Sequence, residues 1–257
     1  DDGPMPQTEE HLSILQLLQV KNCIIVLTKI DKVNQKRLDN VCSLIKKMMH
    51  KTIFSDAEIF HISNKTSQGI DNLVSHLKII ALNYHHKEVK GNFRLSVDRR
   101  FLVKGSGIVI TGTVVSGEVS VGEELIHSKS GESLKIRAIH SQSKKSKNGI
   151  QGHRCSLNIT GQKITIDKIS RGDWILSKNV FFVTKRLDAV LSILKNEKKI
   201  FKHWTAIHLY LGSGNVTGRI AILGSFSINP GEKKIVQLVL DKPVHAVFDD
   251  KFVIRDI

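Results

Sequence analysis

Apolar residues in the first 90 positions recur mainly with the spacing of helices. Leu12, Leu15 and Leu18 lie three apart, and similar stripes follow in 35–51 and 69–82. The runs 23–27 and 57–62 are short and largely apolar, which is typical of strands covered on both faces. The positions expected to face inward on the second and third helices are Leu38, Val41, Leu44, Ile45, Met48, Ile70, Leu73, Leu77 and Ile80. This alternation predicts a parallel sheet with helices in an α/β layer.

The helical spacing ends near position 90, and short alternating strands with glycine-rich turns follow to the end of the chain. This second pattern predicts antiparallel β-barrels. We therefore expect three domains: a partial α/β domain over 1–90, a first barrel over 91–178, and a second barrel over 179–257, truncated at its C-terminal end. Residues 83–92 have the composition of a linker.

The segment 92–117 carries a charged triplet inside an apolar hairpin. Val97, Phe101 and Val103 predict one half-buried strand, and Gly112 in the next strand suits a β-bulge or a close backbone approach. The triplet is Asp98-Arg99-Arg100. It is either a ligand site or a surface Asp–Arg pair that contributes little to stability.

The charge of the chain bears on its partners. There are 39 Lys and Arg residues against 24 Asp and Glu, a formal net charge of +15. A nucleic acid is the favoured partner, although a membrane surface or an acidic protein also fits. With only two Trp and two Tyr, stacking of bases on aromatic side chains should contribute little. Contacts to phosphate groups and recognition of shape should then supply most of the affinity for a nucleic acid, and this affinity should weaken as the salt concentration rises.

The three cysteines form neither a CxxC pair nor a zinc pattern. No apolar run is long enough to span a bilayer, and the N-terminus is not a signal peptide. We expect a cytoplasmic protein with no membrane association and no metal ligands in this chain, and nothing in the sequence indicates more than a monomer.

Two polar clusters follow the predicted strands of the α/β part, where such sheets bind ligands. The candidate residues are Thr28, Lys29 and Asp31 after the first strand, and Ser63, Asn64 and Lys65 after the second. The Asp31 carboxylate can accept two hydrogen bonds from a guanine base, and the Lys29 stem can lie over the base plane. Ser63 and free backbone N–H groups can bind the guanine oxygen. A helix cap and an ordinary strand–helix loop are the alternatives, and the two clusters together favour a guanine site.

These motifs resemble the translational GTPases. The opening 1–11 is similar to the segment that follows their switch regions, Thr28-Lys29-Ile30-Asp31 to their base-recognition motif, and 105–117 to their second-domain signature. Residues 63–69 resemble a further guanine loop of the family, with Asn64 in place of alanine and Ser67 in place of glycine. Within this group the chain most resembles selenocysteine-specific elongation factors, over essentially all 257 residues. Additional similar stretches are 93–99, 152–158, 171–174 and 216–219.

The resemblance implies a factor that binds GTP or GDP with Mg²⁺ and delivers selenocysteinyl-tRNA to the ribosome, reading an mRNA hairpin through further domains. Asp98, Arg99 and Arg154 match family positions around the amino-acid end of the tRNA. A selenol is far more acidic than a hydroxyl, and a thiol titrates near pH ~8.5. Two guanidinium groups therefore favour a selenolate over serine and cysteine. Asp98 is expected either to receive the aminoacyl ammonium group or to hold an arginine in place.

The resemblance also places functional parts outside this sequence. The phosphate loop, the first switch and the magnesium-linked motif would precede Asp1, and winged-helix domains would follow Ile257. We therefore expect the Mg²⁺ ligands to lie outside this chain, and the chain alone to bind guanine nucleotides weakly and not to hydrolyse GTP. Whether it acts as an enzyme stays open. The alternatives are a general aminoacyl-tRNA carrier like elongation factor Tu, or a non-catalytic module that binds tRNA or the ribosome.

Overall fold

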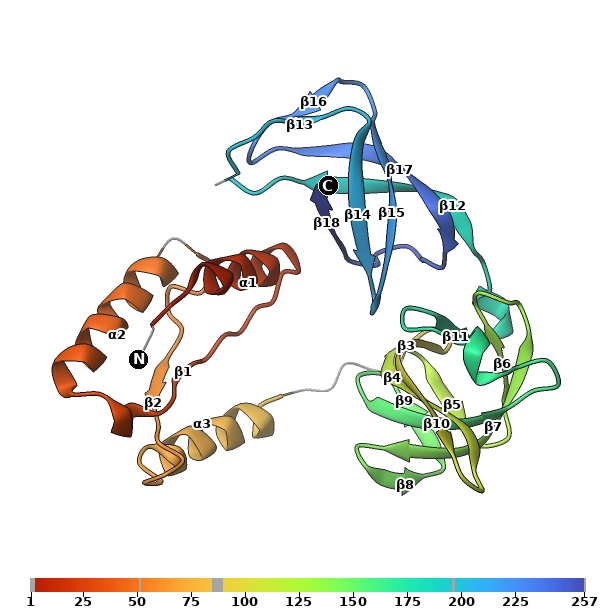
Figure 1. Ribbon diagram of the computed structural model, residues 1–257, viewed down its shortest axis with the longest axis horizontal. Helices are drawn as coiled ribbons and strands as arrows, with labels where there is room; N and C mark the ends of the chain where they lie inside the picture. Colours follow the sequence, from red (N-terminus) through yellow and green to blue (C-terminus); the bar gives the residue numbers. More distant parts are fainter. Residues whose placement is uncertain (1–2, 51, 85–89, 196, 257) are drawn as a thin grey trace. The chain divides into compact units, whose positions relative to one another are not determined.

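The computed structural model describes residues 3–50, 52–84, 90–195 and 197–256. The chain divides into two compact units, residues 1–87 and 88–257 (Figure 1). Half of the predicted linker 83–92, residues 85–89, lies outside the described residues, as do positions 1, 2, 51, 196 and 257 of the predicted segments. The domain boundaries at 90 and 178 stay predictions.

The first unit is the predicted α/β layer. Its helices are α1 (Pro6–Leu17), α2 (Gln35–Met49) and α3 (Ile70–Leu82), with a short 3-10 helix η1 (Ile30–Lys32). Two parallel strands, β1 (Ile25–Leu27) and β2 (Ile59–His61), pair Ile25 with Ile59. Leu12 of α1 and Ile45 of α2 pack in one core with Ile25 and Ile59, and α3 contacts the other face through His76 and Phe60. No helix of the described residues is long and apolar enough to cross a membrane.

Three inward-facing predictions for these helices are wrong. Leu44, Leu77 and Ile80 leave 52%, 47% and 37% of their surface exposed, whereas Met49 is buried in place of Leu44. The reason is the size of the sheet. Two strands of three residues offer too little apolar surface to cover the whole stripe of a helix of 13 or 15 residues.

The second unit begins with a closed antiparallel barrel. Its strands are β3 (Arg94–Val103), β4 (Gly107–Ser116), β6 (Glu124–His127), β7 (Ser133–Ser141), β10 (Arg154–Thr160) and β11 (Trp174–Leu176). They pair in the order β10-β4-β3-β11-β6-β7, and a further β10–β7 pairing closes the ring (Figure 1). Additional elements are β5 (Glu118–Ser120), β8 (Lys144–Ser146), β9 (Asn148–Ile150), and the 3-10 helices η2 (Ile166–Lys168) and η3 (Lys178–Val180).

A β-bulge interrupts the long β3 strand at the charged triplet. Val97 pairs with Gly112 and Arg99 with Thr111, so Asp98 is the extra residue. An extra residue moves the following side chains to the other face of a strand. The predicted single face of Val97, Phe101 and Val103 is therefore wrong: Val97 is fully buried, while Phe101 and Val103 are 43% and 42% exposed.

The second β region is a five-stranded antiparallel sheet in the order β12-β17-β15-β14-β18. The strands are β12 (Thr184–Ser192), β14 (Thr205–Leu211), β15 (Gly214–Ile222), β17 (Lys233–Val244) and β18 (Phe252–Asp256), and β13 (Phe201–Lys202) pairs with β16 (Ser227–Ile228). Within the described part, no pairing joins the outer strands β12 and β18, so this sheet is a half-barrel rather than a closed one. The predicted order, an α/β part followed by antiparallel β structure, is confirmed.

A buried ionic cluster joins the two β regions. Arg94 of β3 donates from Nη1 and Nη2 to the Asp250 carboxylate at 3.0 and 2.5 Å, and from Nε to His245 Nε2 at 3.0 Å. Its guanidinium lies 4.7 Å from the centre of the Trp174 ring. Since Arg94 can only donate, His245 must be neutral, with Nδ1 donating to the Phe182 carbonyl. Burial lowers the pKa of His245, and the charge of Arg94 lowers it further.

Candidate functional site

The first candidate site lies at the carboxyl ends of β1 and β2. Because the strands are parallel, Thr28 and Lys29 leave β1 on the same edge at which Ser63, Asn64 and Lys65 leave β2. Asp31 follows in η1. Ser63 is fully buried, and the other five residues are exposed. The structure thus gathers the six predicted residues at one edge of the sheet.

A short hydrogen bond connects the two loops of this edge. The Ser63 hydroxyl donates to Asp31 Oδ1 at 2.5 Å. Ser63 Oγ in turn accepts from the Thr66 N–H at 3.3 Å. The Ser63 hydrogen bond lowers the pKa of Asp31, and the positive charges of Lys65 and Lys32 add to this effect. Asp31 is therefore an oriented carboxylate with Oδ2 available to accept hydrogen bonds.

Each of the two loops has a residue with a positive φ, in the left-handed region of backbone conformation. Lys29 has φ 60° and Gly69 has φ 73°. A Cβ added at Gly69 would lie 2.0 Å from the His61 carbonyl oxygen, so only glycine fits under the end of β2. This geometry keeps Ser63 close to Asp31.

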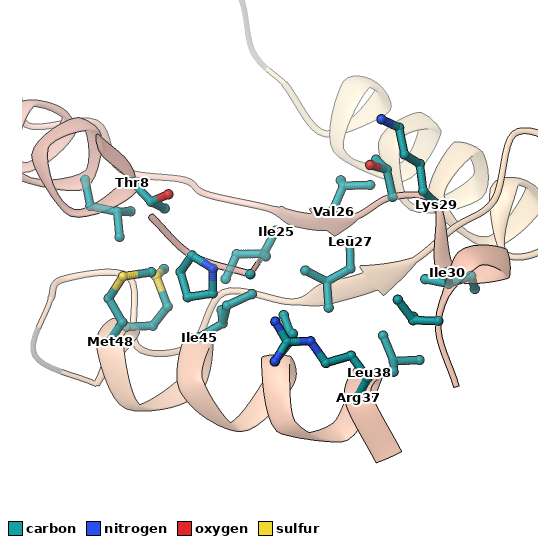
Figure 2. Close-up of a pocket in the computed structure, with 17 residues that line it drawn as sticks. Thr8, Ile25, Val26, Leu27, Lys29, Ile30, Arg37, Leu38, Ile45 and Met48 are labelled. Carbon is teal, nitrogen blue, oxygen red and sulfur yellow. The ribbon is translucent and has the colours of Figure 1, made fainter. Parts of the chain in front are cut away.

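An apolar hollow of about 340 Å³ lies beside the candidate guanine site, between β1 and α2 (Figure 2). Thr28 and Lys29 line one end of it, and most of the remaining lining is aliphatic. Asp31, Ser63, Asn64 and Lys65 are not among the lining residues. The hollow is therefore distinct from the polar edge that suits a base.

We predict that Ser63→Ala weakens the binding of a fluorescent GDP analogue without unfolding the unit. The substitution removes the hydroxyl that orients Asp31 and holds its pKa low. A loss of roughly threefold to tenfold is expected, the range for a hydrogen bond to a charged group that is largely exposed. Ser55→Ala is the matched control, because its hydroxyl only approaches the neighbouring Asp56 at 3.5 Å. Equal affinities for the two variants would contradict a role for Ser63 in this site.

The second candidate site is a shallow pocket on the first barrel. The bulge in β3 presents Asp98, which accepts from the Thr111 hydroxyl at 2.7 Å. Arg154 of β10 donates from both terminal nitrogens to the Asp98 carboxylate, with Nη2 at 3.0 Å from Oδ1. Residues 98 and 154 are far apart in the sequence, but β10 and β3 both pair with β4. The barrel therefore brings two of the predicted residues into a fork-to-carboxylate pair.

The electrostatics of the pocket favour a bound anion. Burial acts to raise the pKa of Asp98, but the hydrogen bonds from Arg154 and Thr111 and the charges of Arg154 and Arg99 outweigh it and leave the pKa low. The Asp98 carboxylate raises the pKa of Arg154. The exposed side chain of Arg99 makes no hydrogen bond or ion pair within the described part of the chain. Arg154 is thus directly paired with Asp98, while the Arg99 guanidinium has no direct partner among the described residues and adds positive charge near Asp98.

The sequence did not single out Arg171, which lines the same pocket. Asp98, Arg99, Arg154 and Arg171 together surround a hollow of about 360 Å³. Three guanidinium groups against one carboxylate leave an excess of two positive charges. The sequence of residues 171–174 indicates only a turn, at 171–173, and a stretch of family similarity. Their place in the pocket depends on the loop before β11, which no local pattern reveals. We refer to these four residues as the arginine pocket.

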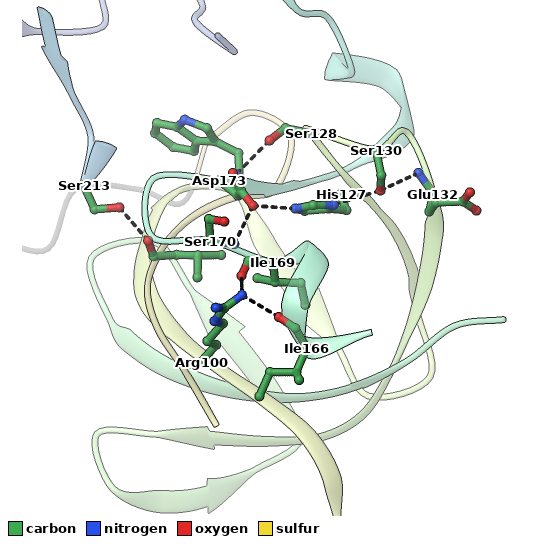
Figure 3. A network of polar contacts seen from close by, with 12 residues as sticks. Arg100, His127, Ser128, Ser130, Glu132, Ile166, Ile169, Ser170, Asp173 and Ser213 are labelled. Carbon is green, nitrogen blue, oxygen red and sulfur yellow. Dashed lines mark hydrogen bonds and ion pairs between the residues drawn. The ribbon is translucent and has the colours of Figure 1, made fainter. Parts of the chain in front are cut away.

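Arg100 does not belong to the arginine pocket. Its Nη1 donates to the Ile169 carbonyl and, at 2.6 Å, to the Ile166 carbonyl (Figure 3). It therefore holds η2 and the following residues against the barrel. The charged triplet divides into Asp98 and Arg99 at the pocket and Arg100 in the scaffold.

Comparisons with known proteins show which families the chain resembles. Residues 1–82 match the elongation factor Tu GTP binding domain, and residues 187–257 match the selenocysteine-specific elongation factor, beta-barrel domain. The chain is 34% identical over 257 residues to the selenocysteine-specific elongation factor of Escherichia coli, covering 100% of this chain and 39% of that protein. For the factor of Methanocaldococcus jannaschii, the identity is 27%, covering 91% of this chain and 50% of that one.

Solved structures agree with the sequence comparison. The apo form of translation elongation factor SelB from Methanococcus maripaludis superposes with a TM-score of 0.86 at 26% identity, covering 98% of this chain and 58% of that one. A bacterial selenocysteine-specific elongation factor gives a TM-score of 0.83 at 26% identity, covering 99% of this chain and 41% of that one. The resemblance predicted from the sequence is confirmed. The chain spans about two fifths to one half of the length of the curated relatives that it matches.

Proposed function

Since this chain belongs with the selenocysteine-specific elongation factors, which it matches from end to end, we propose that it binds the aminoacyl end of selenocysteinyl-tRNA at the arginine pocket. In this proposal the pocket serves GTP-controlled delivery of that tRNA to the ribosome. The observation that carries the proposal is the oriented Arg154–Asp98 pair, with Arg99 and Arg171 lining the same hollow.

The chemistry of the pocket suits a selenolate. Arginine is charged at every physiological pH and binds an anion through a planar fork of N–H donors. The two positive charges in excess favour an anionic side chain over a neutral hydroxyl. In this role Asp98 orients Arg154 through two hydrogen bonds rather than binding the ligand directly. The alternative for Asp98 is contact with the aminoacyl ammonium group, for which its bonds to Arg154 and Thr111 leave little capacity.

The α/β unit supplies the guanine side of a nucleotide site in this proposal. Residues 1–82 match a GTP-binding domain, and the oriented carboxylate of Asp31 suits the two N–H donors of guanine. Lys29, Thr28, Asn64 and Lys65 would surround the base. Magnesium would act at the phosphates, for which we expect ligands outside this chain.

The proposal predicts that Arg154→Ala reduces the preference for selenocysteinyl-tRNA over seryl-tRNA by roughly tenfold. A tenfold change corresponds to the loss of one charge-assisted hydrogen bond between the Arg154 side chain, which is half exposed, and the ligand. Equilibrium binding of the labelled selenocysteinyl-, seryl- and cysteinyl-tRNAs, with a GTP analogue present, measures the preference. Arg154→Lys should give an intermediate value, because it keeps the charge but loses the fork.

Arg137→Ala serves as the control, since Arg137 is an exposed arginine of β7 and does not line the pocket. An equal loss for all three tRNAs would favour a general aminoacyl-tRNA carrier. Absence of tRNA binding by the wild type would remove the proposal, and guanine binding should be unchanged in every variant.

A further inference from the structure

The turn between β14 and β15 contacts the first barrel. Leu211 and Gly214 form the last pair of this hairpin, so Gly212 and Ser213 make a two-residue turn. The Ser213 hydroxyl donates to the Val97 carbonyl at 2.7 Å and lies 2.7 Å from Ser96 Oγ, which also accepts from the Ser213 N–H at 3.0 Å. Figure 3 shows Ser213 reaching the barrel beside the network of Asp173. A turn of the second β region is thus bonded to β3 one residue before Asp98.

The fit of this turn leaves no room for a side chain at its glycines, Gly212 and Gly214, or at Gly172 of the barrel. A Cβ added at Gly214 would lie 2.8 Å from the Gly172 Cα, and one at Gly172 would lie 2.5 Å from the Gly214 Cα. At Gly212 an added Cβ would lie 2.7 Å from Trp174. Contacts below 3.0 Å force a displacement, so the two backbones pack directly on each other at Gly172 and Gly214. Arg171 immediately precedes Gly172 in the sequence.

Arg171 is bonded to the same turn. Its Nε donates to the Ser213 carbonyl at 3.2 Å. Among the described residues its guanidinium makes no other hydrogen bond, which leaves both Nη groups for a ligand in the pocket that Arg171 lines. A long, exposed arginine side chain loses much conformational entropy when it is ordered. The bond to Ser213 supplies that order before a ligand binds.

The loop of Arg171 is also held on its barrel side. His127 is fully buried and its Nε2 lies 2.9 Å from Asp173 Oδ2, which also accepts from the Ser170 N–H at 2.7 Å (Figure 3). The other ring nitrogen of His127 bonds to Ser130 Oγ at 2.8 Å. Ser170 and Asp173, on either side of Arg171 and Gly172, are therefore held in place. A displacement of the β14–β15 turn must then move Arg171 and Gly172 rather than the whole loop.

We propose that Ser213 is a positioning residue of the arginine pocket, and that the second β region sets the orientation of Arg171 toward an anionic group of the bound tRNA. The proposal rests on the proposed function. The anion is either the selenolate of the amino acid or a phosphate of the same tRNA, since both suit a guanidinium. In either case Arg171 is correctly oriented in the arginine pocket only when the β14–β15 turn contacts the barrel.

A double-mutant cycle tests this inference in the whole chain. Arg171→Ala is expected to weaken selenocysteinyl-tRNA binding about tenfold, and Gly214→Ala about fivefold, because the added methyl group displaces Gly172 and Arg171. Ser213→Ala should weaken it about threefold. In the Arg171→Ala background both turn substitutions should lose most of their effect, because they act mainly through Arg171 and only secondarily through the bonds of Ser213 to β3. Additive losses would overturn the proposal. Asn215→Ala, an exposed neighbour in the same hairpin, is the control.

The same variants identify the anion. If the losses appear with selenocysteinyl-tRNA but not with seryl-tRNA, Arg171 binds the selenolate. If they are equal for both, it binds a phosphate.

A measurement without tRNA separates this inference from the proposed function. In ¹⁵N-labelled protein, the Nε–H signal of Arg171 should exchange slowly with water in the wild type and quickly in Gly214→Ala. Unchanged exchange in that variant would overturn the positioning role, whatever the tRNA result. Protected exchange in the wild type without any tRNA binding would instead count against the proposed function alone.

Discussion

Replacing Asp250 with asparagine is expected to lower the free energy of unfolding of the 88–257 unit by about 3–5 kcal/mol. Asp250 and Arg94 have only 15% and 5% of their side chains exposed. Asparagine removes the negative charge and leaves the Arg94 guanidinium buried between His245 and the Trp174 ring. An unpaired buried charge costs far more than the net value of the original pair.

Urea unfolding followed by tryptophan fluorescence measures this effect. The only two tryptophans of the chain, Trp174 and Trp204, both lie in this unit, so the signal does not report on the α/β unit. Asp249→Asn is the matched control. Its side chain is 76% exposed, its pair with Lys251 spans 3.4 Å, and asparagine tolerates its φ of 70°. We expect a change below about 1 kcal/mol there. Equal transition midpoints for the two variants would mean that the buried cluster does not hold the β regions together.

Replacing Gly112 with alanine is expected to destabilise the first barrel by about 3 kcal/mol, the upper end of the usual cost of overpacking. A Cβ at this position would lie 2.1 Å from the Ser96 carbonyl oxygen and 2.7 Å from Leu95 Cδ2. Neither can move freely, since Leu95 is fully buried and Ser96 is bonded to Ser213. Gly112 also pairs with Val97 beside the bulge that presents Asp98.

The tryptophan fluorescence of Trp174, which lies in β11 against β3, reports this unfolding. Gly105→Asn is the control, because a Cβ at Gly105 meets nothing within 4 Å and asparagine accepts its φ of 79°. Gly112→Ala should also reduce the preference for selenocysteinyl-tRNA, since displacement of β3 moves Asp98 and hence Arg154. A Gly112→Ala variant as stable as Gly105→Asn would contradict the close approach of β4 to β3.

Both expectations concern the first four residues of β3, Arg94–Val97. Arg94 anchors the start of β3 to the second β region, and Ser213 binds Ser96 and Val97 immediately before the bulge. The strand that carries Asp98 and Arg99 is therefore held by both the barrel and the second β region. In the proposed function this rigidity favours anion binding, because preorganised donors need no rearrangement when the ligand binds.

The sequence by itself determined the order of the fold and the clustering of the candidate guanine-site residues at one edge of the sheet. Helical and strand periods are local, so the α/β layer and the strand-rich remainder followed from residue spacing. Parallel strands place their carboxyl ends together, and Asp31 and Ser63 were therefore expected at one edge before their 2.5 Å bond was known. For Gly112 the sequence predicted either a β-bulge or a close backbone approach, and the structure shows the close approach, opposite the bulge in β3.

Only the tertiary structure showed how Asp98, Arg99 and Arg154 come together, added Arg171 to the arginine pocket, and separated Arg100 from it. The bulge at Asp98 reverses the faces of the second half of β3, and bulges depend on pairing between strands rather than on the pattern of one strand. Arg154 reaches Asp98 through the pairing of β10 and β3 with β4. Arg171 reaches the pocket through a turn from the second β region. Leu44 and Leu77 stay exposed because the sheet beneath them is narrow. Each of these outcomes depends on contacts between residues distant in sequence, which the spacing of residues along the chain does not encode.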